Sequence, residues 1–309
     1  MKVFEDNFVE YFEDKTIIAL GGFDGLHLGH RALIEKTIHI AKRLNCKSMI
    51  FTFKNHPLSI INEEAAPKLL MSNQYKQELL AEYNIEILNM AEFHAEFMKL
   101  SPEEYISNLV KHYNASGLVV GFNHRFGYKN LGDIDLLKDL SKTLGFNLYV
   151  VPPVKYKGEI VSSSKIRNLL SEDGDIEKAN KMLSRYYTLE GEIIRGKQLG
   201  RKLGFPTVNL DYSKEYVLPR GGVYFSIVEH NNKKYKGITN IGYNPTVENH
   251  KLSIETHIID FNQELYNEKI KIYFVKRIRD EKKFNSLTEL SEQLKNDKIF
   301  ALKQKIEKI

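Results

Sequence analysis

The sequence has little of what marks exported or membrane-bound proteins. It contains one cysteine, Cys46, which excludes an internal disulfide and favours a reducing compartment. No stretch approaches the roughly 20 apolar residues that a membrane-spanning helix needs. Residues 1–15 are acidic and lack the continuous apolar core of a secretory signal peptide. We therefore expect a cytoplasmic protein that does not bind membranes.

The charge pattern argues against nucleic acid as a partner. The 45 Lys and Arg exceed the 40 Asp and Glu by only five, and no dense basic block precedes the C-terminal tail. That tail, residues 302–309, is better interpreted as a solvated helix end than as a binding arm. A nucleic-acid binder would need a clustered basic face with interleaved aromatic residues, and the sequence shows none. The mild positive charge suits small anionic ligands, and no pattern predicts an oligomeric state.

The first half reads as an α/β domain. At 309 residues the chain is too long for one ordinary core, so two domains are expected. Strand-like and helix-like segments alternate from Thr16 to about Val151, which predicts a parallel sheet with right-handed crossovers. Ser101, Pro102 and Glu104, for example, have the spacing of a capped helix start, and Gly145 should close a helix over residues 133–145. In such sheets ligands bind beyond the carboxyl ends of the strands.

The second half has a different pattern, which begins near Ser184 to Thr188. Five segments rich in β-branched and aromatic residues alternate with turn residues, and this predicts an antiparallel barrel or sandwich. Residues 286–306 have helical spacing and should pack on it. We therefore expect a Rossmann-like domain with a parallel sheet over residues 1–184 and an antiparallel β-barrel domain with a terminal helix over residues 185–309.

The stretch LGGFDGLHLGH, residues 20–30, points to a nucleotide. It follows an apolar strand and enters a helix, where glycine lets backbone approach a ligand and N–H groups attract anions. His27 and His30, three apart, can donate to one phosphate and stabilise charge on it. One histidine capping the helix while the other lies on the surface is the plainer alternative. A metal site is disfavoured because no carboxylate or cysteine nearby completes a ligand set. The candidate nucleotide contacts are Gly22, Phe23, Asp24, His27 and His30.

Two distant stretches support the same interpretation. Ser162, Ser163 and Ser164 open a helix with Arg167 one turn further on, a combination that can clamp phosphate. Ordinary N-capping with a surface arginine explains that stretch about equally well. The loop 121–133 follows a strand and is rich in turn formers, so it can hold adenine or a second substrate, with Asn123 as the candidate contact.

The second half carries its own candidate ATP site in GKQLGRKLGFPTVN, residues 196–209. In an extended segment Thr207 and Asn209 face the same way and present two neutral oxygens, which suit Mg²⁺ bound to a nucleotide. Glycines allow phosphate to approach backbone N–H groups. A turn leading into a buried strand is the alternative, and the stretch is not a Walker loop. The candidate residues are Gly196, Gly200, Arg201, Gly204, Pro206, Thr207 and Asn209.

A glutamate in the stretch SIETHIIDF is the candidate base. Alternation places Ile254, Thr256 and Ile258 on one face and Glu255 on the other, with His257. A carboxylate within a largely apolar β unit is costly unless it is used or paired. Glu255 can therefore take the proton from a hydroxyl that attacks a γ-phosphate. An exposed strand glutamate is the alternative.

These stretches together resemble the bacterial bifunctional riboflavin kinase/FAD synthetases. The first half shares GGFDGLHLGH, FTFKNHP, VVGFNHRFGYKNLGD and VSSSKIR with that family's nucleotidyltransferase domain, and the second shares residues 196–209, TNIGYNPT and the ETH strand with its riboflavin kinase domain. The resemblance implies riboflavin + ATP → FMN + ADP, then FMN + ATP → FAD + pyrophosphate. It implies Mg²⁺ with ATP as co-substrate.

The resemblance also implies residue roles. His27 and His30 would contact the ATP phosphates, as would Ser162, Ser163, Ser164 and Arg167, while Asn123 would lie in the loop that binds nucleotide and flavin. Thr207 and Asn209 would hold Mg²⁺. Glu255 would activate the ribityl 5′-hydroxyl, and Arg279 would lie near the flavin or the nucleotide flap.

The sequence departs from the family pattern at a few positions. Asn123 and His124 stand where Asp-Phe or Asp-His is frequent, and Asn130 stands where arginine is common. Smaller departures are Ser164 for threonine, Val208 for alanine and Asn267 for glycine. Two alternatives follow: a chain in which only the kinase half is active, and a flavin-binding or regulatory protein without turnover. The second predicts loss of the acid and the histidines, which are all present.

Overall fold

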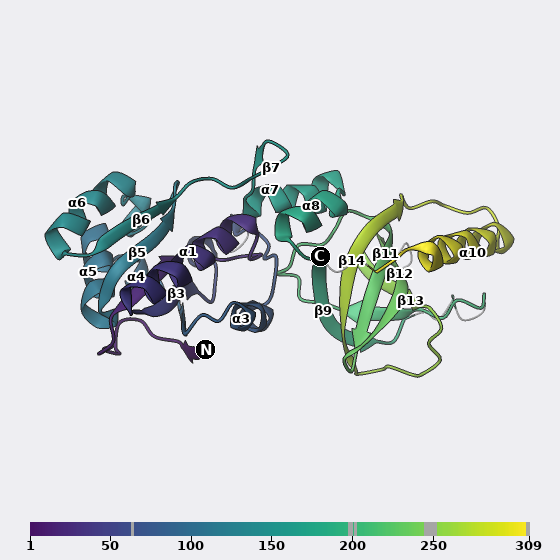
Figure 1. Ribbon diagram of the computed structural model, residues 1–309. Coiled ribbons are helices and arrows are strands. Elements are labelled where there is room, and N and C mark those ends of the chain that lie inside the picture. Colours follow the sequence, from purple (N-terminus) through teal and green to yellow (C-terminus); the bar gives the residue numbers. More distant parts are fainter. Residues whose placement is uncertain (63–64, 197–199, 201–202, 244–251, 307–309) are drawn as a thin grey trace. The chain divides into compact units, whose positions relative to one another are not determined.

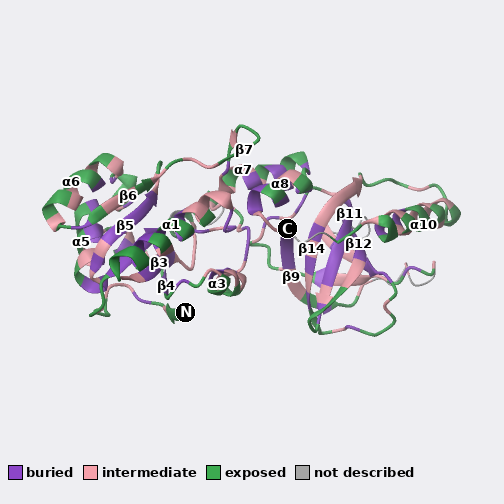
Figure 2. Ribbon diagram, viewed as in Figure 1, coloured by how far each residue is buried: buried purple, intermediate pink, exposed green. Residues whose placement is uncertain are grey.

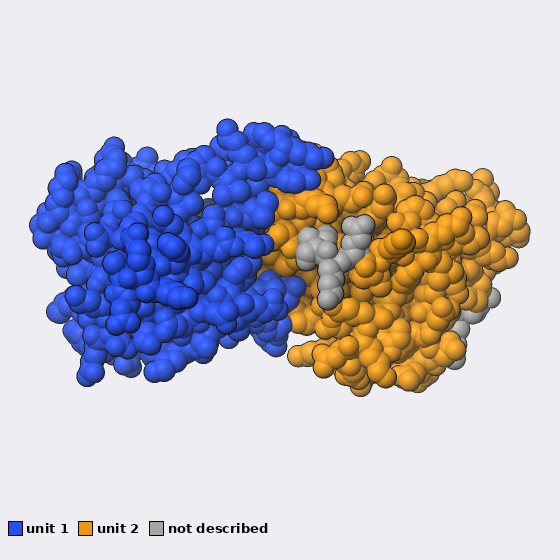
Figure 3. All heavy atoms as spheres, viewed as in Figure 1, with its two compact units in different colours: residues 1–67, 72–162 blue, residues 68–71, 163–309 orange. Residues whose placement is uncertain are grey.

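The protein folds into two compact units, drawn in blue and orange in Figure 3. Unit 1 consists of residues 1–67 and 72–162, and unit 2 of residues 68–71 and 163–309. The structure is a computed structural model, and it describes residues 1–62, 65–196, 200, 203–243 and 252–306. Among these residues, no helix is both long and apolar enough to cross a bilayer.

Unit 1 is built on the predicted parallel sheet. The six strands pair in the order β1-β4-β3-β2-β5-β6, and every pairing is parallel. The two short strands β7 and β8 form a separate hairpin. The strands are β1 (Lys2–Phe4), β2 (Thr16–Leu20), β3 (Lys47–Phe53), β4 (Ile87–Ala91), β5 (Ala115–Gly121), β6 (Asn147–Val151), β7 (Lys155–Tyr156) and β8 (Glu159–Ile160).

Helices connect these strands, and their ends follow the expected capping chemistry. Ser101 and Glu104 form a reciprocal capping box before a first-position proline, and Gly145 ends a helix in the left-handed conformation. Both predictions are confirmed. The helices are α1 (Leu28–Leu44), α2 (Leu58–Ile61), α3 (Asn73–Glu82), α4 (Ala95–Met98), α5 (Pro102–Tyr113), the 3₁₀ turn η2 (Tyr128–Asn130) and α6 (Ile134–Leu144).

Both faces of the sheet are buried, as a doubly wound fold requires. Ile18 and Leu20 of β2 belong to the core that α5 and α6 cover. Ile17 and Ala19, which point the other way, are also fully buried, and α1 packs on β2, β3 and β5. The central strands β2, β3, β4 and β5 are accordingly mostly buried, while α6 exposes its outer surface (Figure 2). This is why β2 is an unbroken apolar run.

The strand order creates a switch point between β2 and β5. From β2 the chain winds through β3 to β4 on one side, and then crosses back to β5 on the other side of β2. Parallel strands end at the same edge, so the segments that follow Leu20 and Gly121 leave the sheet side by side. Ligands of such sheets bind at this kind of crevice.

The N-terminal segment contributes more than the sequence predicted. Its first residues add β1 to the sheet edge, and Asp6 is buried behind it. The hydroxyl of Tyr113 donates to Asp6 Oδ2 at 2.6 Å, and Asn89 exchanges hydrogen bonds with the backbone of Asp6. Burial and the neighbouring carboxylate raise the pKa of Tyr113, which keeps its hydroxyl a donor. Phe8 stacks on Phe51 in the core.

Unit 2 is a closed barrel, which confirms the β-barrel expected for the second half and excludes a sandwich. Its strands pair antiparallel in the cyclic order β10-β13-β12-β11-β14-β9. Inside it, hydroxyl groups of Ser226, Thr239 and Thr256 bond to one another at 2.7 and 2.9 Å, so these buried polar atoms are satisfied. The strands are β9 (Tyr187–Ile194), β10 (Val208–Asp211), β11 (Gly222–His230), β12 (Lys233–Tyr243), β13 (Leu252–Ile258) and β14 (Lys269–Arg279).

Three helical segments before residue 184 pack with the barrel. Asn180 donates to the carbonyl of Phe274 and accepts from the N–H of Tyr187, which ties α8 to β14 and β9. The packing boundary therefore falls at Ser162, earlier than the change in sequence pattern near residue 184. The boundary at residue 184 stays a prediction about sequence domains. The segments are α7 (Ser163–Asn168), the π-helical η3 (Leu169–Asp173) and α8 (Ile176–Leu183).

The C-terminal helix packs on the barrel as predicted. It is α10 (Leu287–Lys303), and it contacts β12. The ammonium group of Lys236 donates to the carbonyls of Leu302 and Gln304 at 2.7 and 2.8 Å, which supplies partners for two carbonyls at the helix end.

We predict that Tyr113→Phe lowers the free energy of unfolding of unit 1 by about 1–3 kcal/mol, because it leaves the buried Asp6 carboxylate short of a donor. Chemical denaturation followed by circular dichroism measures the change. Tyr149→Phe on β6 is the matched control, since its hydroxyl bonds to none of the described residues. Equal effects of the two changes would contradict the prediction.

Candidate active sites

The histidine motif begins with a turn in an unusual backbone conformation. After β2 ends at Leu20, Phe23, Gly25 and Leu26 all have positive φ, at 47°, 81° and 36°. Two of them are not glycine, so the turn is strained and must be held by its surroundings. Phe23 and Leu26 are fully buried, which anchors the turn on the apolar core. Gly22 and Asp24 lie in this turn, at the switch point.

His27 and His30 are brought together at the start of α1. Their rings stack with centroids 3.7 Å apart and planes 14° apart. His27 is the N-cap: its Nδ1 accepts from the N–H groups of Gly29 and His30 at 3.1 and 3.3 Å. Because Nδ1 is an acceptor, the neutral ring carries its proton on Nε2. From the sequence we expected N–H groups at the start of α1 to bind the anion. Two of these groups, those of Gly29 and His30, are bonded to His27 Nδ1 instead.

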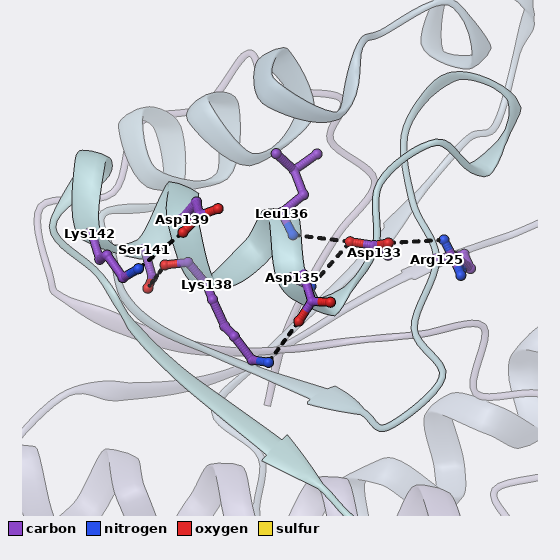
Figure 4. A network of polar contacts seen from close by, with 8 residues as sticks. All are labelled: Arg125, Asp133, Asp135, Leu136, Lys138, Asp139, Ser141 and Lys142. Carbon is purple, nitrogen blue, oxygen red and sulfur yellow. Dashed lines mark hydrogen bonds and ion pairs between the residues drawn. The ribbon is translucent and has the colours of Figure 1, made fainter.

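The loop after β5 is held closed by its own contacts. Phe126 and Gly132 exchange backbone hydrogen bonds across it, and Arg125 donates to Asp133 at 3.3 Å. Figure 4 shows Arg125 approaching Asp133, which also accepts from the backbone of Leu136 at the start of α6. Asn123 is exposed at the mouth of this loop, beside the strand that pairs with β2. The loop therefore has a defined set of internal contacts.

His124 in this loop is an apolar-site histidine. Its ring stacks on Phe126 with centroids 5.7 Å apart and planes 14° apart. Burial lowers the pKa of His124 to about 4, so the ring is neutral at physiological pH. It therefore acts in the loop as an aromatic packing residue.

The serine stretch is divided between the two units. Val161, directly before Ser162, passes the histidine turn: its carbonyl oxygen lies 3.7 Å from where a Cβ at Gly29 would stand. Ser163, Ser164 and Arg167 belong to α7 in unit 2, with Ser164 exposed and the other two half-buried. Arg167 Nε donates to the carbonyl of Lys68 at 2.6 Å. Ser162 thus directly follows a residue that lies close to the start of α1.

In the barrel, strand register brings the candidate base and a candidate metal ligand together. Glu255 on β13 lies directly opposite Asn209 on β10 and opposite Asn240 on β12. Residues directly opposite in antiparallel strands share a face, with Cβ atoms roughly 4.5–5.5 Å apart. Thr256, the next residue, is fully buried inside the barrel. The half-buried Glu255 therefore lies on the outer face, flanked by two amides, and the predicted alternation is confirmed.

The glycine-rich segment before β10 is shaped around Asn209. A Cβ at Gly196 would lie 2.7 Å from Asn209 Cγ, so a side chain there would displace this amide. Gly204 has φ +79°, and Gly200 accepts from the N–H groups of Leu203 and Phe205 in a tight turn. Arg201 lies outside the described residues, as does TNIGYNPT from residue 244 on.

His257 fixes the Pro206–Thr207 segment against β13. Its Nδ1 lies 2.9 Å from the carbonyl oxygen of Pro206, so it donates there, and its ring meets Phe205 edge-on at 5.3 Å. Burial lowers the pKa of His257, while the bond to Pro206 opposes the shift. His257 thus holds the carbonyl next to Thr207, which is half-buried directly before β10.

Arg279 makes hydrogen bonds and an ion pair within unit 2. Its guanidinium binds Asp297 of α10, with Nη2 2.8 Å from Oδ2, and Asp297 is almost fully buried. A second arm reaches the carbonyl of Asp280 at 3.1 Å. Arg279 thus joins β14 to the terminal helix, and its assignment to flavin stays a prediction.

Two residues that the sequence analysis did not single out belong to these sites. Asn240 was missed because strand register alone places it beside Glu255. Lys76 on α3 was missed because nothing in its local sequence distinguishes it from a surface lysine. It is 5 % exposed, and its ammonium donates to the carbonyl of Gly22 at 3.3 Å.

Two family models divide the chain between them. The model for FAD synthetase matches residues 10–165, and the model for riboflavin kinase matches residues 183–304. The first range contains the histidine turn, residues 21–27, which leads into α1, and the loop of Asn123. The second range contains Asn209 and Glu255. The sequence-based order of the two halves is therefore confirmed.

Relatives match over nearly their whole length. The bifunctional riboflavin kinase/FMN adenylyltransferase of Bacillus subtilis (strain 168) is 36% identical over 294 residues, covering 94% of this chain and 92% of the relative. That of Escherichia coli (strain K12) is 32% identical over 291 residues, with 94% and 92% covered. A solved structure titled macrolide-efflux protein, from Streptococcus pneumoniae, has a TM-score of 0.88 at 27% identity, covering 98% of this chain and 99% of its own. The two relatives, matched over more than 90% of their length, show that the chain belongs to the bifunctional riboflavin kinase/FMN adenylyltransferase family.

Proposed function

We propose that this chain makes FAD from riboflavin in two ATP-dependent steps at separate sites. Unit 2 carries riboflavin phosphorylation, which yields FMN and ADP, and the histidine site carries adenylylation of FMN, which yields FAD and pyrophosphate. The observation that carries the proposal is that each half has its own constellation: the stacked histidines after β2, and Glu255 opposite Asn209 in the barrel. ATP is the shared co-substrate, and we place both steps in the cytoplasm.

For adenylyl transfer, the histidine pair stabilises charge on the phosphates. The phosphate of FMN attacks the α-phosphorus of ATP, a bond to FMN oxygen forms, and pyrophosphate leaves. Imidazole donors from His27 and His30 would oppose the negative charge that develops on the oxygens. His27 offers Nε2–H, since its Nδ1 is held by the helix start. Asn123 borders the same switch point, and Ser162, Ser163, Ser164 and Arg167 would complete the triphosphate contacts.

For riboflavin phosphorylation, Glu255 is the general base. It would accept the proton of the ribityl 5′-hydroxyl as that oxygen attacks the γ-phosphorus of ATP and ADP leaves. The donor set beside it fits Mg²⁺: the hydroxyl of Thr207 and the amide oxygen of Asn209 are hard oxygen ligands, and the Asn209 amide occupies space that a side chain at Gly196 would take. Bound Mg²⁺ would neutralise phosphate charge. The glycines, Arg201 and Pro206 would line the nucleotide.

The Asn123–Asn130 loop bears on the alternative that only the kinase half is active. In related proteins an arginine is common where this chain has Asn130, so the loop here lacks that charge. Its closure by Arg125 and Asp133, and its packing through His124 and Phe126, support a formed loop. We therefore propose that adenylyl transfer is retained.

The two activities should separate by mutation. With riboflavin, ATP and Mg²⁺, native protein should produce FMN and then FAD, resolved by chromatography over time. Glu255→Gln should lower FMN formation by roughly 10²-fold or more and leave FMN-to-FAD conversion unchanged, because it removes the base of one step only. His27→Ala should do the reverse, with a loss of roughly 10²–10³-fold.

Matched controls accompany both variants. Glu264→Gln changes an exposed glutamate of the same barrel, and His39→Ala an exposed histidine of the same helix α1. Both should leave FMN and FAD formation unchanged. Loss of both activities from either Glu255→Gln or His27→Ala would contradict independent sites.

The metal assignment has its own test. Asn209→Ala removes one oxygen ligand, so the Mg²⁺ concentration for half-maximal riboflavin phosphorylation should rise roughly tenfold or more. The Mg²⁺ requirement of FMN adenylylation in the same protein should not move. A Mg²⁺ titration of each reaction measures both values, and a parallel rise in the two requirements would exclude Asn209 as a ligand specific to the kinase site.

A further inference from the structure

Lys76 is a buried lysine that neither proposed reaction uses. It lies in α3 and is 5 % exposed. Lysine is almost never fully buried unless its charge is paired, because an ammonium loses its hydration there. Burial lowers the pKa of Lys76 to about 8, and the charge of Asp24 opposes this shift. The fold keeps a costly group at this position.

The ammonium group of Lys76 contacts the backbone just after β2. Its Nζ donates to the carbonyl oxygen of Gly22 at 3.3 Å, and the hydroxyl of Thr52 donates to the same oxygen at 3.0 Å. Lys76 comes from α3 and Thr52 from β3, so two elements distant in sequence hold one carbonyl. This carbonyl belongs to the residue directly before Phe23, the first residue of the turn with a positive φ.

The turn needs this support. Phe23 and Leu26 adopt positive φ, which a residue with a side chain keeps only when its surroundings impose it. Four residues after Phe23 the chain reaches His27, and the two stacked imidazoles begin α1. A displacement of Gly22 would therefore also displace the rings of His27 and His30.

We propose that Lys76 is a positioning residue for adenylyl transfer, whose buried ammonium holds the Gly22 carbonyl and so fixes the turn that presents His27 and His30 to the reacting phosphate. The inference rests on the proposed role of the two histidines. It adds that the charge of Lys76, together with its hydrogen bond, makes the end of β2 favourable for a polyphosphate.

The first test removes the ammonium. Lys76→Met should lower kcat for FMN adenylylation by about 100-fold, because small misplacement of catalytic groups has effects of that size, while KM for ATP changes less. Riboflavin phosphorylation by the same protein should stay within about twofold, which shows that the chain remains folded. Lys36→Met, an exposed lysine on α1, is the matched control and should change neither activity.

The second test keeps the charge. Lys76→Arg retains a cation and donors, so it should recover at least a tenth of native kcat for adenylylation. Thr52→Val removes the other donor to the same carbonyl and should also lower adenylylation selectively. A role in filling space alone would be served better by methionine than by arginine, so the order of the two variants separates positioning from packing.

The third test is the pH profile of kcat/KM for ATP in FMN adenylylation. In native protein it should fall above pH about 8 as the free enzyme loses the Lys76 proton. Among the described residues, Asp24 is the charged group whose field reaches this ammonium, and Thr52 does not titrate. Because guanidinium stays protonated, the fall should be absent in Lys76→Arg up to pH about 10.

The outcomes distinguish this inference from the proposed function. If His27→Ala leaves adenylylation intact, the role of the histidines is wrong and the inference falls with it. If His27→Ala abolishes adenylylation but Lys76→Met keeps kcat within about threefold of native, the inference alone is overturned. Should Lys76→Met not fold, the profile of Lys76→Arg decides: loss of the alkaline fall supports positioning by charge, and its persistence overturns it.

Discussion

Backbone pairing between strands is the constraint on which both sites depend. In unit 1, parallel pairing of β2 with β5 puts the histidine turn and the loop of Asn123 at one edge of the sheet. In unit 2, antiparallel register puts Glu255 opposite Asn209 and Asn240. A slip of one residue in β13 would turn Glu255 into the barrel and Thr256 out of it. The side chains supply the polar groups of each site, but main-chain hydrogen bonding decides which of these side chains lie close together.

Polar groups buried near these sites act mainly on backbone. Lys76 and Thr52 hold the carbonyl of Gly22, His257 holds that of Pro206, and His27 caps α1. Each bond satisfies a group that would otherwise be costly to bury, and each fixes a segment next to a proposed catalytic residue. Such bonds explain how strained or irregular backbone persists where the chemistry needs it.

The two halves keep separate chemistry on one chain, although sequence and packing divide it differently. The family models end and begin at residues 165 and 183, whereas compact packing changes at Ser162. The helices between them are tied to the barrel by Asn180, and residues 68–71 join the same unit beside Tyr216. A chain segment can therefore contribute residues to one family motif, as α7 does with Ser163, and take its stability from the other unit.

The sequence by itself determined the class of each half, the helix caps at Ser101 and Gly145, and the motifs, because these depend on neighbours within a few residues. The strand pattern alone left both a barrel and a sandwich open, and it could not place Asn240 beside Glu255, because closure and register are set by contacts between distant strands. It also missed Lys76 and the packed N-terminal segment around Asp6, whose local sequences resemble exposed chain. Burial of a lysine or aspartate is decided by what packs on it, and only the tertiary structure supplies those partners.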